Sequence, residues 1–184
     1  RKAGVTDRVR FFQQDLFVTD IKDATVVMLY LWPEVNLRLR PKLLAELKPG
    51  ARVVSHSHTM GEWKPDKTSE VLKHNLYSWI IPARVTGTWT WLIPAGKRST
   101  HAVLRLNQSF QEVRGTLTID HSPVPITNAM LTGDQLSFDA RSAMDGHTLS
   151  MKFYGRIEGN AIHGIMILLR GDKKKEIPWE AKRE

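Results

Sequence analysis

Two histidines that stand two residues apart, His56 and His58, are the side chains of this sequence best suited to chemistry. The apolar stretch before them predicts a strand, and alternate residues of a strand point to the same face. Both imidazoles can then bind one metal ion, but a metal site needs a third ligand. Asp66 and His74 are candidates through nearness in sequence alone. Two interpretations stay open: a metal-dependent hydrolase that uses His56, His58 and Asp66, or a pair that is structural or lines a substrate pocket.

A second group of candidates, Tyr30-Leu31-Trp32-Pro33-Glu34, directly follows the apolar run at residues 25–29. It can supply an apolar wall, a backbone carbonyl and one carboxylate. Glu34 can accept a proton or pair with a cationic substrate. Trp32 and Pro33 can equally fill a core and turn the chain, because proline cannot donate a hydrogen bond to a sheet.

Asp15 is the third candidate, because it lies just past a predicted strand at residues 9–13. Ligands of open parallel sheets collect outside the carboxyl ends of the strands. An aspartate in that position can accept a hydrogen bond from the amino group of adenine. The alternative is a loop aspartate that caps the next turn.

The elements that position these residues form a strand, helix and strand. Residues 25–29 are a continuous apolar run, which predicts a strand buried on both faces of a parallel sheet. A short helix is expected from Pro41, with three leucines on one face, until Lys48-Pro49-Gly50 ends it. Residues 52–57 then predict a second parallel strand, and residues 76–81 a late strand of the same sheet.

This arrangement carries a family resemblance. LKPGARVV, after an apolar strand and a leucine helix, resembles the second half of the class I S-adenosylmethionine (SAM) dependent methyltransferase fold, and AGVTDRVRFFQQDLF resembles its third strand and the acidic residue behind it. The run LYLWPEVNLRLRPKLLAELKPGARVVSH, followed by a tryptophan-containing loop, is similar to a subgroup that includes mitochondrial protein-lysine methyltransferases. The resemblance covers roughly residues 1–85, less than half of the chain.

The resemblance implies a site. It implies SAM as cofactor and N-methylation of an amine, either a protein lysine or a small molecule, which must be desolvated and aligned with the methyl group. Relatives tend to carry a histidine at the position of His56, which favours a lining pair over a metal site. The residues implied are Tyr30 and Glu34 for catalysis; Asp15, Leu16, Phe17 and Leu29 for the cofactor; Trp32, Pro33, His56, His58 and Trp63 for the substrate lining; and none for a metal.

One part of that fold is missing from the sequence. SAM-binding folds hold the cofactor with a glycine-rich turn after the first strand, and the nearest clusters here, at residues 155–159 and 159–164, lie in a β-rich region and resemble turns. The chain begins with Arg1 rather than Met. We therefore expect a fragment that binds SAM weakly and is inactive alone. An unpaired sheet edge would remain, which favours a homodimer.

From residue 85 the pattern changes to short strands with frequent turn signals, which is typical of an antiparallel barrel or sandwich. The expected fold class is α/β plus all-β, with an incomplete Rossmann-like sheet over residues 1–84, a junction at Pro82-Ala83-Arg84, and a β-barrel-like part over residues 85–184. Gly87-Thr-Trp89 resembles the opening of lipocalins, so a ligand- or partner-binding barrel on a scaffold is the alternative to an accessory barrel. The eight expected strands are 86–93, 101–107, 113–119, 126–131, 135–140, 149–157, 161–168 and 176–182.

Composition sets the remaining bounds. The 184 residues can bury one substantial core or two small ones, and the absence of cysteine excludes disulfides and a thiol nucleophile but fits either redox compartment. No apolar run approaches the roughly 18 residues that span a bilayer, so we expect a soluble protein. The net charge is +8, and its one dense run, Lys173-Lys174-Lys175, has no interleaved aromatic residues. A solvated loop is therefore favoured there over a nucleic-acid surface.

Overall fold

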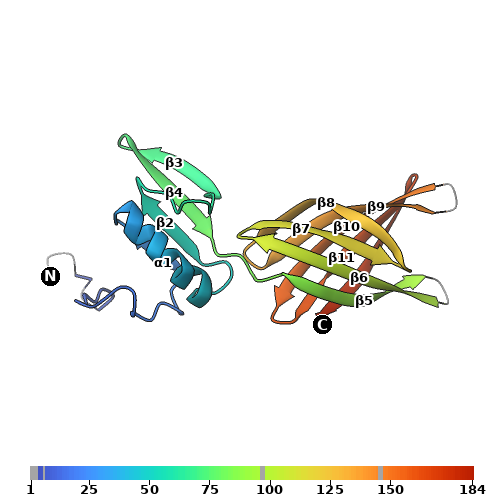
Figure 1. Ribbon diagram of the computed structural model, residues 1–184, viewed down its shortest axis with the longest axis horizontal. Helices are drawn as coiled ribbons and strands as arrows, with labels where there is room; N and C mark the ends of the chain where they lie inside the picture. The colour runs from blue at the N-terminus through green and yellow to red at the C-terminus, as the bar shows by residue number, and fades with distance from the viewer. Residues whose placement is uncertain (1–3, 6, 96–97, 145–146) are drawn as a thin grey trace.

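The computed structural model describes residues 4–5, 7–95, 98–144 and 147–184, and within them the chain forms a small α/β part and a β-barrel (Figure 1). The two parts lie end to end, joined by one extended connection between β4 (His74–Ile80) and β5 (Gly87–Ala95). Among these residues, no helix has the length and apolar character needed to cross a membrane. The α/β part consists of β1 (Val26–Leu29), α1 (Pro33–Glu46), β2 (Arg52–His56), β3 (Lys67–Val71) and β4 (His74–Ile80).

The sheet of the α/β part is mixed and has the strand order β1-β2-β4-β3. β1 and β2 are parallel, with Val26 opposite Arg52, and α1 connects them. β4 runs antiparallel to β2, and β3 pairs with β4 as a hairpin. The predicted strand–helix–strand unit is therefore present, and β4 agrees with the predicted late strand.

The helix is longer than the sequence predicts, because it begins at Pro33 rather than at Pro41. Pro33 occupies the first helical position, where the missing N–H costs nothing. Pro41 lies inside the helix. The buried face of α1 includes Asn36, whose Nδ2 donates to Ser55 Oγ at 2.9 Å. A polar residue on the buried face interrupts the apolar pattern, and this hides the first half of the helix from a periodicity argument.

Two predictions for the N-terminal stretch are wrong. Residues 9–13 form no strand; they are irregular, and the side chain of Phe11 is 93 % exposed. β1 is not buried on both faces, since Met28 is 79 % exposed while Leu29 is buried. The reason is that α1 covers one face of the sheet, and within the described ranges β1 has a neighbour on one side, β2.

The β-rich part is a closed barrel of eight antiparallel strands, and every strand predicted after residue 85 is present. The ring closes where β12 pairs with β5, at Lys182–Thr90 and Arg183–Trp89. Lys173-Lys174-Lys175 opens a strand rather than a loop, and Lys174 Nζ lies 2.8 Å from Glu176 Oε1. The strands are β5 (Gly87–Ala95), β6 (Arg98–Ser109), β7 (Glu112–Ile119), β8 (Ser122–Thr132), β9 (Gln135–Met144), β10 (His147–Glu158), β11 (Ala161–Arg170) and β12 (Lys173–Arg183).

The barrel interior is packed with its own side chains. Phe138 and Phe153 stack with ring centroids 4.5 Å apart, and Trp179 meets Phe153 edge-on at 5.3 Å. Trp91 lies 5.1 Å from Trp179 and 5.9 Å from Phe153. Aromatic pairs at these distances and angles are favourable beyond the area that they bury. The aromatic cluster therefore fills the centre of the barrel.

The turn between β6 and β7 anchors the barrel to the α/β part. Phe110, in this turn, stacks on Trp63 with centroids 6.0 Å apart, and Gln111 Nε2 donates to the carbonyl of Lys64 at 2.8 Å. Lys64 Nζ also lies 2.9 Å from Glu112 Oε1, and this hydrogen bond lowers the pKa of Glu112 below its usual value. The ion pair is exposed, so we expect the aromatic contact to contribute more.

Candidate functional site

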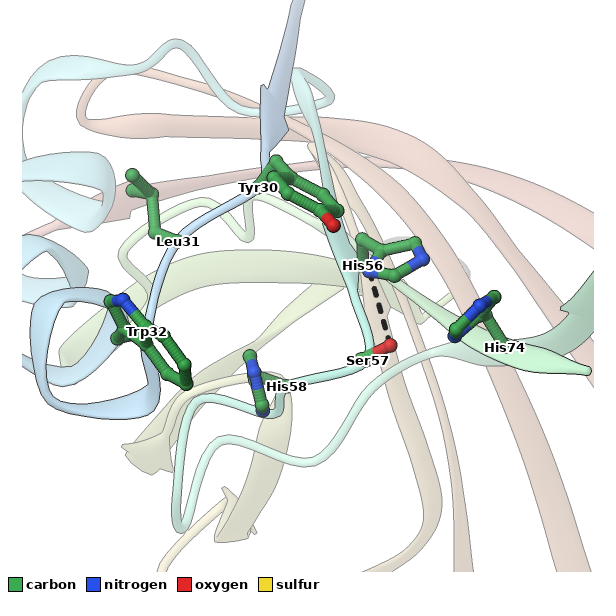
Figure 2. A pocket seen from close by; sticks show the side chains of 7 residues that line it. All are labelled: Tyr30, Leu31, Trp32, His56, Ser57, His58 and His74. Carbon is green, nitrogen blue, oxygen red and sulfur yellow. Dashed lines mark hydrogen bonds between the residues drawn. The ribbon is translucent and has the colours of Figure 1, made fainter.

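The first candidate site is a pocket of about 340 Å³ at the carboxyl ends of β1 and β2. We call it the histidine pocket (Figure 2). One wall comes from the segment after β1, a second from the end of β2, and a third from the start of β4. The lining residues are Tyr30, Leu31, Trp32, His56, Ser57, His58 and His74.

His56 and His58 share this pocket, but not for the reason that the sequence indicates. β2 ends at His56, and Ser57 has a left-handed backbone with φ 62°. Its N–H donates to the carbonyl of Asn75 at 2.7 Å, and the N–H of His58 donates to the carbonyl of His56 at 2.8 Å. A tight turn, rather than strand alternation, therefore brings the two imidazoles into one pocket. Such backbone strain in a non-glycine residue is found disproportionately at functional sites.

His74 is a member of the pocket that sequence reasoning considered as a metal ligand alone. Its ring lies 4.7 Å from the ring of His56. Leu76 pairs with His56 across the β2–β4 ladder, so His74 stands two residues beyond that pair on the same face. The tight β3–β4 turn that places His74 has Leu72 and Lys73 at positive φ, and neither residue is of a type that marks a turn, so the sequence carried no signal for this placement.

The second candidate site is an apolar groove of about 310 Å³ between the irregular segment 14–21, β1 and α1. It shares Tyr30 and Leu31 with the histidine pocket, so the two sites adjoin at the carboxyl end of β1. Of the residues expected to hold a cofactor, Leu16 and Leu29 line this groove. The remaining lining residues are Gln14, Thr19, Ile21, Val27, Met28, Leu39 and Leu43.

The other two expected cofactor residues lie beside the groove rather than in its lining. Asp15 stabilises a turn: its Oδ1 accepts a hydrogen bond from the N–H of Phe17 at 2.8 Å, and its carbonyl accepts the N–H of Thr19 at 3.1 Å. This is the capping role that the sequence left open as an alternative. Phe17 lies under the guanidinium of Arg38, which is 4.5 Å from the ring centroid.

Trp32, Pro33 and Glu34, at the start of α1, differ in whether they line the histidine pocket. Trp32 precedes the first helical residue and is 74 % exposed; it lines the histidine pocket and stacks on His58 with centroids 6.2 Å apart. Pro33 begins the helix, and Glu34 lies exposed in its first turn, where a carboxylate interacts favourably with the helix dipole. Neither contributes to the lining of the histidine pocket.

Trp63, expected to line the substrate, is instead fully buried. Its carbonyl accepts a hydrogen bond from Trp79 Nε1 at 2.9 Å, and its ring packs against Trp79 and Phe110. It contributes nothing to the lining of the histidine pocket. Trp63 therefore belongs to the core at the contact with the barrel.

The metal-dependent interpretation is not supported. In the part of the chain that the structure describes, no group of three histidine, cysteine, aspartate or glutamate side chains is placed to hold a metal ion. Asp66, the proposed third ligand, caps the end of the sheet: its Oδ2 accepts the N–H of Ile80 at 2.7 Å.

Comparisons with known proteins identify methyltransferases as relatives of part of this chain. Residues 1–67 match the family model of the ANTKMT methyltransferase domain. A protein-lysine N-methyltransferase of Saccharolobus islandicus is 42 % identical over 84 residues, which are 44 % of this chain and 52 % of that protein. The adenine nucleotide translocase lysine N-methyltransferase of Mus musculus is 38 % identical over 64 residues, or 35 % of this chain and 28 % of that protein. The predicted resemblance to SAM-dependent methyltransferases is confirmed for this stretch.

A solved structure is also similar. It is an RNA methyltransferase from Salinibacter ruber in complex with S-adenosyl-L-homocysteine, 51 % identical, with a TM-score of 0.44 over 46 % of this chain and 55 % of that one. The chain spans about half the length of the Saccharolobus islandicus relative and about a quarter of the Mus musculus one.

Proposed function

From the match of residues 1–67 to a methyltransferase family, we propose that this chain is the acceptor-side part of a SAM-dependent protein-lysine N-methyltransferase. The observation that carries the proposal is that the family match and the two cavities involve nearly the same residues. Residues 1–67, which match the methyltransferase family model, contain the whole lining of the groove and the lining of the histidine pocket except for His74. The barrel, over residues 85–184, then is a separate accessory domain.

The sheet order is compatible with this proposal. A doubly wound sheet has the order 3-2-1-4-5-6, in which strands 4 and 5 are adjacent and parallel. β1 and β2 fit these two places, as an adjacent parallel pair connected by a helix. In this strand order, strand 3 lies at the edge of the sheet and has strand 2 as its one neighbour. Residues 9–13, if they correspond to strand 3, have no such neighbour among the described residues, which explains their irregular structure.

The residues present fit only part of SAM. The groove offers apolar side chains to a flat ring, and Asp15 lies next to it. A glycine turn between a strand and a helix, which would hold the rest of the molecule, is not found among the described residues. The described glycines with positive φ lie elsewhere: Gly133, Gly159 and Gly171, for example, are in hairpin turns of the barrel. SAM, when bound, supplies an activated methyl group.

We therefore predict that the 184-residue chain binds SAM with a dissociation constant above roughly 1 mM, which corresponds to about 4 kcal/mol or less. Isothermal titration calorimetry measures this directly. The Saccharolobus islandicus relative, titrated in the same buffer, is the positive control. A micromolar dissociation constant for the chain alone would show that the missing turn is not required.

The proposed acceptor is the side-chain amine of a protein lysine. Tyr30 lines both the pocket and the groove, which supports a role for it at the boundary between acceptor and donor. An aromatic wall favours alignment of an amine, which is the main requirement of methyl transfer. Glu34, exposed in the first turn of α1, can attract a lysine ammonium toward the pocket.

The test of the proposed function uses the complete gene product. Incubation with SAM and lysine-rich proteins is expected to give methylated lysines, which tandem mass spectrometry locates. Transfer to RNA and to small amines is assayed in parallel. Methylation of either of these without methylation of any lysine would refute the lysine assignment.

A barrel that binds a small ligand in its interior is disfavoured, because Phe138, Phe153 and Trp179 pack against one another there.

A homodimer through β1 stays a prediction. β1 presents the exposed side chains of Val26 and Met28 and, among the described residues, has one strand neighbour. Light scattering after size-exclusion chromatography measures the mass in solution, and Met28→Lys is expected to favour the monomer.

A further inference from the structure

Three rings stand in a row along the wall of the histidine pocket. The rings of Tyr30 and His56 have centroids 4.8 Å apart, and those of His56 and His74 are 4.7 Å apart. Figure 2 shows Tyr30 and His74 on opposite sides of the His56 ring. Tyr30 lies next to the groove, His56 is half-buried, and His74 is exposed. Tyr30 is itself 82 % exposed, so both ends of the row reach solvent and His56 is its most buried member.

His56 is also held by a hydrogen bond. Its Nδ1 lies 3.0 Å from Ser57 Oγ, in the strained turn that ends β2. When Nδ1–H donates to Ser57 Oγ, Nε2 is left as a free proton acceptor. One ring nitrogen is then used for orientation and the other is available to a ligand.

Among the residues that the structure describes, none that lines the pocket carries a carboxylate. The groups that face His56 are Tyr30 from the end of β1, Ser57 and His58 from the end of β2, and His74 from β4. A lysine ammonium that enters finds no negative partner in this lining, so any hydration that it loses there is not compensated by an ion pair. Loss of the proton before methyl transfer removes that cost and exposes the nucleophilic lone pair.

We propose that His56 is the group that takes this proton and that His74 passes it to solvent. The inference rests on the proposed lysine methylation. One N–H bond of the ammonium breaks, its electron pair stays on nitrogen, and the proton binds His56 Nε2. His74, exposed beside His56, relays the proton outward and so acts as a positioning and relay residue. His58 stacks on Trp32 instead and shapes the entrance.

The first experiment compares His56→Ala, His74→Ala and His163→Ala in the complete gene product. His163 is a matched control, because it lies half-exposed on the outside of β11, 3.7 Å from Glu180. We expect kcat to fall about 100-fold or more for His56→Ala, the usual contribution of a general base. KM for SAM should stay within about twofold. For His74→Ala, kcat should fall about tenfold. For His163→Ala, kcat should not change.

Two readouts separate proton transfer from a purely structural role. Wild-type activity should rise with pH and then level off, whereas His56→Ala should keep rising, because the substrate must then lose its proton to water. Added imidazole should restore part of the activity of His56→Ala and none of His58→Ala. Unchanged kcat in His56→Ala, or the wild-type pH profile in that variant, would overturn the inference. Wild-type protein without any methylation would instead refute the proposed function.

A third readout needs no activity. A lysine-containing peptide added to the 184-residue chain with labelled histidines should change the ring NMR signals of His56 and His74, and leave that of His163 unchanged. A lysine-to-norleucine peptide, which lacks the amine, should change neither. Equal changes with both peptides would contradict proton transfer from the amine.

Discussion

Gly164→Ala is expected to lower the free energy of unfolding of the barrel by about 3 kcal/mol or more, the upper range for overpacking a core. Gly164 lies in β11 between Gly155 of β10 and Trp179 of β12. A Cβ atom there would stand 1.9 Å from the carbonyl oxygen of Tyr154, 2.7 Å from Gly155 Cα and 2.8 Å from Trp179 Nε1. Two of these contacts are to backbone, which a paired strand cannot move.

The chain offers two matched controls for this prediction. At Gly155 a Cβ would meet side chains alone, Ile162 Cγ2 at 2.5 Å and the Trp179 ring at 2.9 Å, so Gly155→Ala should cost less. At Gly159 nothing lies within 4 Å, but φ is +61°, so Gly159→Ala should cost about 1 kcal/mol of backbone strain. Urea unfolding followed by tryptophan fluorescence ranks the three variants. Gly164→Ala at or below the cost of Gly159→Ala would contradict the packing around Trp179.

The glycines in its turns show why the barrel was the part of the fold best predicted from the sequence. Antiparallel neighbours in a barrel are joined by tight turns, so the residues that specify a strand and its turn are adjacent in the sequence. Gly133 between β8 and β9 and Gly159 between β10 and β11 are examples. Alternation in the sequence then gives the inner face, as with Ala102, Leu104 and Leu106, all of them buried. Local signals therefore sufficed for eight strands.

The α/β part depends more on distant contacts, and there the sequence was less informative. From its residue type, Asn36 would be expected at the surface. Its burial is explained by a hydrogen bond to Ser55, which lies 19 positions away in the sequence. Residues 9–13 have a strand-like pattern, yet a strand needs a neighbour, which the local sequence does not reveal. His56 and His58 line one pocket, but the turn at Ser57 and the position of His74 depend on how β2 meets β4, which the local sequence does not reveal.

Trp63 illustrates the same point, because a loop tryptophan next to a candidate site can line it or support it from behind. Trp63 is fully buried, with Trp79 at 5.6 Å and Phe110 of the barrel at 6.0 Å between ring centroids. Trp63→Ala should therefore leave a large cavity and cost about 3–5 kcal/mol of unfolding free energy. Trp63→Phe should cost less, because an aromatic ring is kept between these neighbours.

Trp32 is the matched control, since it lines the histidine pocket and is 74 % exposed. Trp32→Ala should change the unfolding free energy by at most about 0.5 kcal/mol while weakening binding of a lysine peptide. Trp63→Ala should also speed proteolysis between the sheet and the barrel, because the stacked Phe110 anchors the β6–β7 turn. Chemical denaturation, limited proteolysis and peptide titration distinguish the two tryptophans. Full stability of Trp63→Ala with weakened peptide binding would restore Trp63 to the substrate lining.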